Sequence, residues 1–464
     1  MEENNKSDKK WSIEDVRSKY ILKVIFGYLQ EDKLLNIIRY NKNIQNKLNK
    51  DINDYKVRTK IEIEIEIGNP LKDKFQFINI SNENYFHIYL DNTNNEIKRN
   101  YVTKEDKFTK IIIIIDNEIK SLNKLFEQCK FIKKINFIKF FRKNINDMSH
   151  MFNGCKLLKE LNLSNFNTNK VTDMSHMFHG CESLKELNLN NFNTNNVTNM
   201  SYIFYGCIFL KEINFNNNFI TNKVTDMSYM FYGCKFLKEK NIFNFNTNNV
   251  TNMKCMFYGN ESLKDVNLSK YITNKVTDMS CMFAGCSSLT NIIFSDFNTN
   301  NVTDMSYMFF ECKALMELDL SNFNTEKVTN MEEMFFNCSR LKQVDLSNFN
   351  TVNVTNMDHI FCNCSILKEL NLSNFNTVNV TNMDHMFYGC SSLIELNLSN
   401  FEIKNVKTME YMFYNCNSLK KLIFPKLKRN SEIKMNYMFD GCKPLKDRNQ
   451  LENKIMNRSA CIII

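Results

Sequence analysis

Proline and glycine are scarce in this chain, whose 464 residues include 3 prolines and 10 glycines. Flexible low-complexity proteins are rich in these residues, so that class is excluded. The sequence also shows no glycine-rich phosphate-binding loop, no nucleophile–base–acid set and no paired cysteines spaced for a metal. We therefore expect a protein that is not an enzyme and that holds no cofactor or metal.

Long apolar runs are missing as well. Residues 1–6 are polar, and the longest aliphatic run, Ile111 to Ile115, has the length of a strand. A secretion signal needs an apolar core and a membrane span needs about 20 apolar residues, so we expect a cytoplasmic protein. The net charge is +9, from 60 basic and 51 acidic side chains. This mild excess slightly favours acidic partners or an anionic membrane surface and does not indicate nucleic-acid binding.

What the sequence has instead is a repeat. A phenylalanine recurs every 26 residues, with one step of 27, and a cysteine follows three residues later in 12 of the 13 units. Asn260 takes the place of that cysteine in the remaining unit. Self-similarity at such a fixed period indicates a solenoid. The repeated phenylalanines are Phe126, Phe152, Phe178, Phe204, Phe231, Phe257, Phe283, Phe309, Phe335, Phe361, Phe387, Phe413 and Phe439.

The unit that starts at Val171 contains two local patterns. The apolar residues between Met174 and Cys181 are spaced as on one face of a short helix, and Thr172 or Asp173 stands where an N-cap belongs. Residues 187–189 then alternate apolar and polar, as in a strand that faces a core on one side. We therefore expect an α/β repeat with one short strand and one short helix per coil, in which neighbouring coils complete the core.

A longer motif recurs over about residues 120–445: Leu-Asn-Leu-Ser-Asn-Phe-Asn-Thr-x-x-Val-Thr-x-Met-x-x-Met-Phe-x-x-Cys-x-x-Leu. It resembles the BspA-like leucine-rich repeat of bacterial surface proteins, mycoplasma lipoproteins and many protozoan proteins. The resemblance implies a right-handed solenoid and a role in adhesion or protein binding, and it implies no catalytic residues.

Three departures from the repeat fall in consecutive units. An extra residue lies within 216–219, Lys240 takes a core leucine position, and Asn260 takes the cysteine position. We expect the stack to bend or loosen there.

The chain divides into four segments. Residues 1–60 have a helical pattern, and residues 61–116 carry strand signals at 61–67, 75–80, 85–90 and 111–115. We expect the second segment to be a β-rich lead-in that protects the exposed end of the stack. Residues 117–445 form the solenoid, and residues 446–464 form a basic tail.

The helical segment leaves two interpretations open. Residues 20–29 and 34–38 faintly resemble an F-box, the helical motif that docks repeat receptors onto cullin ubiquitin ligases, although the usual opening Leu-Pro is missing. The alternative is a helical cap or a separate small domain at the start of the solenoid.

The repeat accounts for most cysteines and histidines. Each of the 12 regularly spaced cysteines is alone in its unit, as expected of a small buried thiol. His150, His176, His359 and His385 share a position that holds tyrosine in other units, which indicates a half-exposed structural position rather than a ligand site. The aromatic position three residues further on is expected to pack between coils or to form an outer strip.

Two strand positions point away from the expected core, because side chains alternate across a strand. They place acidic and amide side chains on the inner sheet face of the solenoid, which solenoids use for partners. We predict partner binding at Glu160, Glu186, Glu212, Glu239, Glu317, Glu369 and Glu395, and at Asn162, Asn188, Asn214, Asp319, Asp345, Asn371 and Asn397. The alternative is a solvated sheet with side-chain ladders.

The chain ends Ala-Cys461-Ile-Ile-Ile. A cysteine four residues from the end, followed by aliphatic residues, is a prenylation pattern, and the nearby basic residues would add attraction to an anionic membrane. Because isoleucine is abundant here, a chance match is the alternative.

These patterns predict a non-enzymatic scaffold that binds a protein partner and is anchored at Cys461 to the cytoplasmic face of a membrane. A substrate receptor of a ubiquitin ligase and a surface adhesin are the alternatives.

Overall fold

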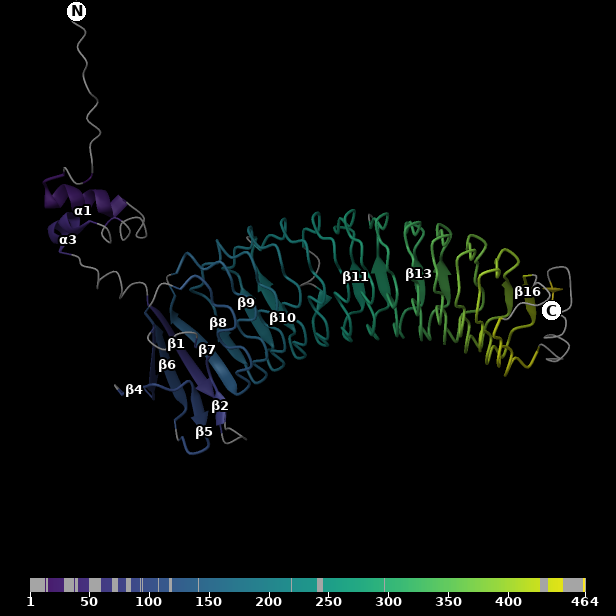
Figure 1. Ribbon diagram of the computed structural model, residues 1–464, viewed down its shortest axis with the longest axis horizontal. Helices are drawn as coiled ribbons and strands as arrows, with labels where there is room; N and C mark the ends of the chain where they lie inside the picture. Colours follow the sequence, from purple (N-terminus) through teal and green to yellow (C-terminus); the bar gives the residue numbers. More distant parts are fainter. Residues whose placement is uncertain are drawn as a thin grey trace, which may run out of the picture.

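The computed structural model shows a long, gently curved solenoid with a mixed sheet at its N-terminal end (Figure 1). It describes residues 60–444 apart from 69–73, 81–84, 92, 94, 107, 117–118, 141, 218, 240–244, 296 and 426–432. Outside this stretch it describes residues 13, 16–28, 37, 41–49 and 462–463.

Most of the described coils contribute a short strand at the same place in the repeat, although residues 368–371 do not form one. Several pairs of neighbouring strands are hydrogen-bonded in parallel. Leu187 pairs with Ile213, and Leu318 pairs with Val344, so partners lie 26 residues apart. These inward residues alternate with exposed ones, as the sequence predicts. The strands of the coils are β7 (Ile132–Lys139), β8 (Glu160–Asn162), β9 (Glu186–Leu189), β10 (Glu212–Phe215), β11 (Asp265–Asn267), β12 (Asn291–Ile293), β13 (Glu317–Asp319), β14 (Gln343–Asp345), β15 (Glu395–Asn397) and β16 (Lys421–Phe424).

A second ladder runs along another side of the solenoid. Twelve parallel bridges in succession link one residue per coil, from Ser121 to Lys434. In many of these coils an aspartate or asparagine side chain at this position also accepts a hydrogen bond from the backbone two residues on, as Asp173 does from the Ser175 amide at 2.8 Å. This is an Asx turn, and it explains why the repeat keeps aspartate or asparagine there.

The core is a continuous column of apolar side chains inside the coils. The repeated phenylalanines stack ring on ring from Phe126 to Phe439, with centroids 5.4–6.0 Å apart. The methionine, valine and leucine positions of the repeat surround this column and are almost fully buried. One coil cannot bury these groups alone, so the stack provides the core.

The short helix predicted in each coil is wrong. From Met148 to Cys155 the chain forms consecutive tight turns, and His150 and Gly154 have positive φ angles of 56° and 76°. Alternate backbone amides bond to the next coil: the His150 amide donates to the Ser175 carbonyl at 2.9 Å. A helix requires negative φ and bonds within its own segment, and a helix this short is marginal in water. Successive turns also direct every third or fourth residue inward, which is why the spacing resembles a helix.

The N-terminal sheet continues the sheet of the solenoid. Its order is β4-β3-β6-β1-β7-β8, in which β1 pairs antiparallel with β7 and so covers the edge of the first long strand of the stack. The isoleucines of β1 point inward and its glutamates outward, as their alternation predicts. The bounds are β1 (Ile61–Ile67), β2 (Lys74–Gln76), β3 (Phe86–Leu90), β4 (Glu96–Ile97), β5 (Tyr101–Thr103) and β6 (Lys110–Ile115), with β2 and β5 paired separately.

In the part of the N-terminal segment that the structure describes, the chain forms the helices α1 (Lys19–Tyr28) and α3 (Lys42–Leu48). Leu22 of α1 and Ile44 of α3 are fully buried in a small core of their own. Among the described helices, none is long and apolar enough to cross a bilayer.

At the other end, a two-residue strand lies against the last strand of the stack. This strand, β17 (Ile462–Ile463), pairs antiparallel with β16. The backbone of the chain's aliphatic end therefore covers a sheet edge.

Candidate functional site

The predicted partner-binding residues lie on the outer face of the sheet. Five of the seven glutamates are exposed, and Glu212 and Glu239 are half-buried. All seven asparagines and aspartates of the prediction are exposed. The residues between the two positions, such as Leu187 and Leu318, are buried at 1% and 4% exposure. The structure thus brings both sets together in two adjacent rows along the solenoid.

The glutamate row has weak internal partners. The Lys134 Nζ lies 2.8 Å from a Glu160 carboxylate oxygen, and the Lys421 Nζ lies 3.1 Å from Glu395. Each lysine occupies the glutamate's position in a neighbouring coil. The hydrogen bond to Glu160 raises the pKa of Lys134. Because these side chains are exposed, such ion pairs contribute little and can exchange with a partner's charges.

The amide row has a structural role as well. The Asn188 side-chain oxygen accepts a hydrogen bond from the Asn190 amide at 3.0 Å, and Asp319 accepts one from the Ser321 amide at 2.9 Å. Hydrogen bonds from Ser321 lower the pKa of Asp319. These Asx turns end the strands. A partner would therefore bind mainly those side-chain polar atoms of the amide row that the turns do not use. The same bond is present at Asn162, Asn267, Asp345, Asn371 and Asn397.

The regularly spaced cysteines are structural. From Cys155 onward, each thiol donates to the carbonyl of the repeated phenylalanine one coil earlier, with sulfur–oxygen distances of 2.9–3.3 Å. Burial raises the pKa of Cys207 to about 12. Asn260 replaces the thiol with its own amide, which donates to the Phe231 carbonyl at 2.8 Å.

A hollow lies at the extra residue. It measures about 700 Å³ and is lined by β10 and the turn after it, including Asn216 and Phe219. A hollow thus accompanies this departure from the repeat, while Phe204 and Phe231 of the adjoining coils remain stacked at 5.4 Å. At Asn260 the bond between coils is kept. Lys240 lies outside the described residues.

The histidine and tyrosine position forms a stacked column at a corner of the coils. His150 and His176 stack with centroids 4.3 Å apart, and His176 stacks on Tyr202 at 4.4 Å. The aromatic position three residues on forms a second column, in which Tyr205 and Tyr232 stack at 4.4 Å. Ring faces are covered by neighbours in both columns, so packing between coils explains most of this strip. Burial and the neighbouring His150 and His179 lower the pKa of His176 to about 4.

One stretch of this corner departs from the repeat, and the sequence analysis missed it. The residue before the histidine position is a serine in six coils and is acidic in four later ones, Glu332, Asp358, Asp384 and Glu410. In the same stretch Glu333, His359 and His385 follow one another in the aromatic column. Comparing one repeat position across all coils would have revealed this change from Ser–aromatic to acid–histidine. We call these seven residues the acidic corner.

Two sequence predictions fall outside the residues that can be described. Cys461 and the basic tail before it are not described, and residues 1–60 are described only within α1, α3 and a few neighbouring positions. Lipidation at Cys461 and docking by the helical segment therefore stay predictions.

Comparisons with known proteins agree with the repeat. A family model described as "Mycoplasma protein of unknown function, DUF285" matches residues 120–219, 208–315, 260–345, 290–371 and 342–452. None of the curated proteins compared with the chain matches it.

Two solved structures are similar in part. A leucine-rich repeat protein from Eubacterium ventriosum ATCC 27560 is 17% identical, with 65% of this chain and 81% of that chain covered and a TM-score of 0.33. A TLR13–ssRNA13 complex is 18% identical, with 67% of this chain and 51% of that chain covered and a TM-score of 0.19.

The family assignment rests on the repeat, because the overlapping matches of the family model run from residue 120 to residue 452. The chain belongs to this family of Mycoplasma-type repeat proteins, and its coil is a BspA-like leucine-rich repeat.

Proposed function

We propose that the chain is a non-enzymatic scaffold that binds a protein partner on the outer face of its sheet. The observation that carries the proposal is the set of glutamates between Glu160 and Glu395 on the solvent-facing side of the coil strands, of which Glu212 and Glu239 are half-buried and the others exposed. Neighbouring coils repeat at about 4.8 Å, and Asn291 and Gln343 interrupt the row, so its carboxylates are spaced at multiples of this distance. A partner with basic side chains at a similar spacing matches it, and electrostatic attraction would speed their association.

Charge reversal tests this proposal. A variant with Glu186→Lys and Glu317→Lys should lose the partners that are cross-linked to the wild-type chain in cells of its source. A matched control reverses two exposed acids in turns of other repeat positions, Glu326→Lys and Glu402→Lys. Equal loss in both variants, or in neither, would refute binding by the sheet face.

A prenyl anchor at Cys461 is the finer part of the proposal. The terminal motif and the basic residues before it support a two-part anchor on the cytoplasmic face of a membrane. The pairing of β17 with β16 gives Ile462 and Ile463 of this motif a second role, as a cover for the sheet edge.

An enzymatic assay separates these two roles. Incubation of the full chain with a purified prenyltransferase and geranylgeranyl diphosphate should add one lipid mass, and Cys461→Ser should abolish it. Membrane-fraction recovery should fall in the same variant. If the chain gains no mass with either the farnesyl or the geranylgeranyl donor, prenylation of Cys461 is refuted. Covering the sheet edge would then be the remaining role of the aliphatic residues.

A second candidate is a ubiquitin-ligase receptor that docks through its N-terminal helices. The observation that favours it is an apolar surface on α1, where Tyr20, Ile21 and Val24 are 76%, 50% and 42% exposed. Exposed apolar groups of this kind mark docking sites when they cluster. Binding of a ligase adaptor to the full chain should be lost in Ile21→Asp with Val24→Asp, and absence of any adaptor binding by the wild-type chain would eliminate this candidate.

A further inference from the structure

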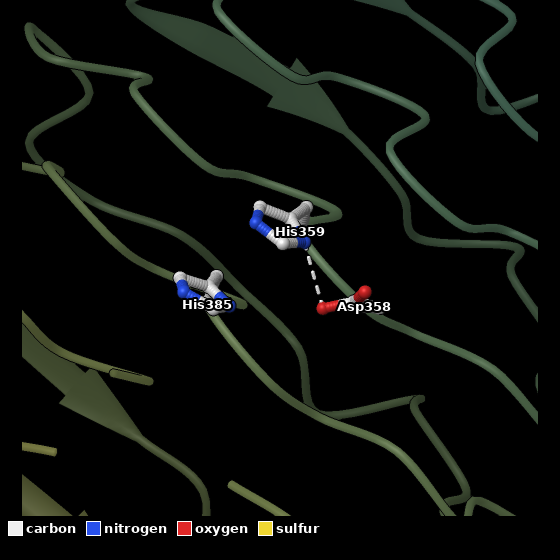
Figure 2. A group of neighbouring side chains, drawn as sticks. All are labelled: Asp358, His359 and His385. Carbon is white, nitrogen blue, oxygen red and sulfur yellow. Dashed lines mark ion pairs between the residues drawn. The ribbon is translucent and has the colours of Figure 1, made fainter. Parts of the chain in front are cut away.

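We propose that Asp358, His359 and His385 form a binding site for a divalent transition-metal ion of the Zn²⁺ type. One ligand atom from each residue lies within 4.8 Å of the others. Figure 2 shows both imidazole rings with a nitrogen on the side of the Asp358 carboxylate. Two imidazoles and one carboxylate, with a fourth position left for water, are a common ligand set for a catalytic or exchangeable zinc ion.

One of the three ligand atoms has no polar partner. His385 Nδ1 is shielded from solvent and makes no hydrogen bond, whereas His359 Nδ1 and Asp358 Oδ1 lie 2.7 Å apart as an ion pair that is also shielded from solvent. An unsatisfied buried polar atom is costly and calls for an explanation, and a metal ion shared with the ion pair would give the His385 nitrogen a partner.

The repeat provides an internal comparison. Where the earlier coils place a buried serine beside a ring, as at Ser149 with His150 and Ser175 with His176, this coil places Asp358 beside His359. Serine and tyrosine are sufficient for packing at these two positions, because Ser306 and Tyr307 occupy them in another coil. The change to acid and histidine in adjacent coils is therefore not required by the stack.

The surrounding charge favours a cation. Glu333 precedes His359 in the aromatic column, and its backbone amide donates to the Asp358 carbonyl at 2.9 Å. Asp384 and Glu410 lie in the next two coils at the position of Asp358, half-buried. A metal ion would offset this concentration of acidic side chains.

Metal binding requires a local adjustment. The rings of His359 and His385 are stacked at 4.1 Å with an angle of 9° between them, so one ion cannot lie in both ring planes. Zinc binds imidazole nitrogen at about 2.0–2.1 Å, which places ligand atoms roughly 3–3.5 Å apart. At least one ring must therefore turn out of the stack, and His359 Nδ1 and Asp358 Oδ1, which lie 2.7 Å apart, must separate slightly. The His385 ring can turn at the expense of its contact with Tyr411, at 4.9 Å.

Titration of the full chain with Co²⁺, used alone as a spectroscopic probe, tests the site. We expect the visible absorption of a four- or five-coordinate ion at one equivalent, and displacement of Co²⁺ by Zn²⁺. His359→Tyr, His385→Tyr and Asp358→Ser each introduce a residue that the same position holds in other coils, so the fold should be kept. Each should weaken binding by at least about 10-fold, because even the loss of a group that orients a ligand costs this much.

The matched control is the other stacked histidine pair. His150→Tyr with His176→Tyr changes the same repeat position in coils whose neighbouring residue is serine, and it should leave the Co²⁺ spectrum unchanged. Three results would overturn the proposal: no absorption with the wild-type chain, equal loss in the control, or a spectrum with sulfur-to-cobalt charge transfer, which would assign the ion to cysteines.

Discussion

Asn260 donates to the Phe231 carbonyl the hydrogen bond that a cysteine thiol donates in the neighbouring coils. The equivalent thiol of Cys286 bonds to the Phe257 carbonyl at a sulfur–oxygen distance of 3.1 Å. The exchange has a cost, since the other polar atom of the amide, Asn260 Oδ1, is buried and has no hydrogen-bond partner. The bond between coils is thus kept while a new unsatisfied acceptor is introduced.

The first prediction follows from this relationship. Asn260→Cys should raise stability by about 1–2 kcal/mol, because it removes the unsatisfied acceptor and restores the thiol bond. Urea denaturation followed by circular dichroism would measure the change. The reverse variant, Cys286→Asn, is the control and should lower stability. A destabilised Asn260→Cys protein would show that the amide oxygen has a partner in solution.

The second prediction concerns the threonine at the end of each repeat. Thr299 is almost fully buried; its hydroxyl donates to the Asn324 carbonyl at 2.8 Å and accepts from the Asn324 amide at 2.8 Å. Thr299→Val keeps the shape but leaves both backbone groups without this partner, at a cost of about 1–3 kcal/mol. Thr299→Ser should retain most of the stability. Amide exchange at Asn324 would measure the local effect, and unchanged protection in the valine variant would contradict the assigned role.

The third prediction is a pH dependence. Burial lowers the pKa of His176 from 6.5 to about 4. The unfolded chain therefore binds a proton at this residue at a higher pH than the folded chain does, and stability falls as the pH drops from about 6.5 to about 4. His176→Tyr, which places at this position the residue found in the next coil, should make the slope of stability against pH shallower in this window. A slope that stays the same would show that His176 is protonated as readily in the folded chain as in the unfolded one.

Much of the fold could be predicted from the sequence because the core residues recur at the same positions of each repeat. The leucine alternation gives the strands, and the phenylalanine and cysteine spacing gives the period. The helix was mistaken because tight turns and a helix share a spacing of three to four residues. What distinguishes them here is a positive φ at positions such as His150 and Tyr202, which side-chain type does not reveal.

The candidate site was less predictable for a related reason. Averaging over the coils identifies positions that all coils need, such as the repeated phenylalanine, and conceals positions where one coil differs. Asp358 and His385 lie in different coils, 27 residues apart, and their proximity depends on the stacking that brings equivalent positions together. Their meeting follows from the structure, once adjacent coils are known to be in register.

The fourth prediction tests that register through thiol reactivity. Among the cysteines that the structure describes, Cys281 is half-buried, while the others are buried. It occupies the aromatic column, as does Cys255 in the coil before, whereas the regularly spaced thiols face the core. Because alkylation requires solvent access to the thiol, brief treatment of the native chain with iodoacetamide should label Cys281 ahead of Cys312, which is fully buried. Peptide mass spectrometry on the Cys461→Ser variant would measure the labelling rates of Cys281 and Cys312. The control is a denatured sample, in which the two labelling rates should become equal. Comparable labelling of Cys312 in the native state would mean that the coils separate in solution and that the phenylalanine column is not continuously packed.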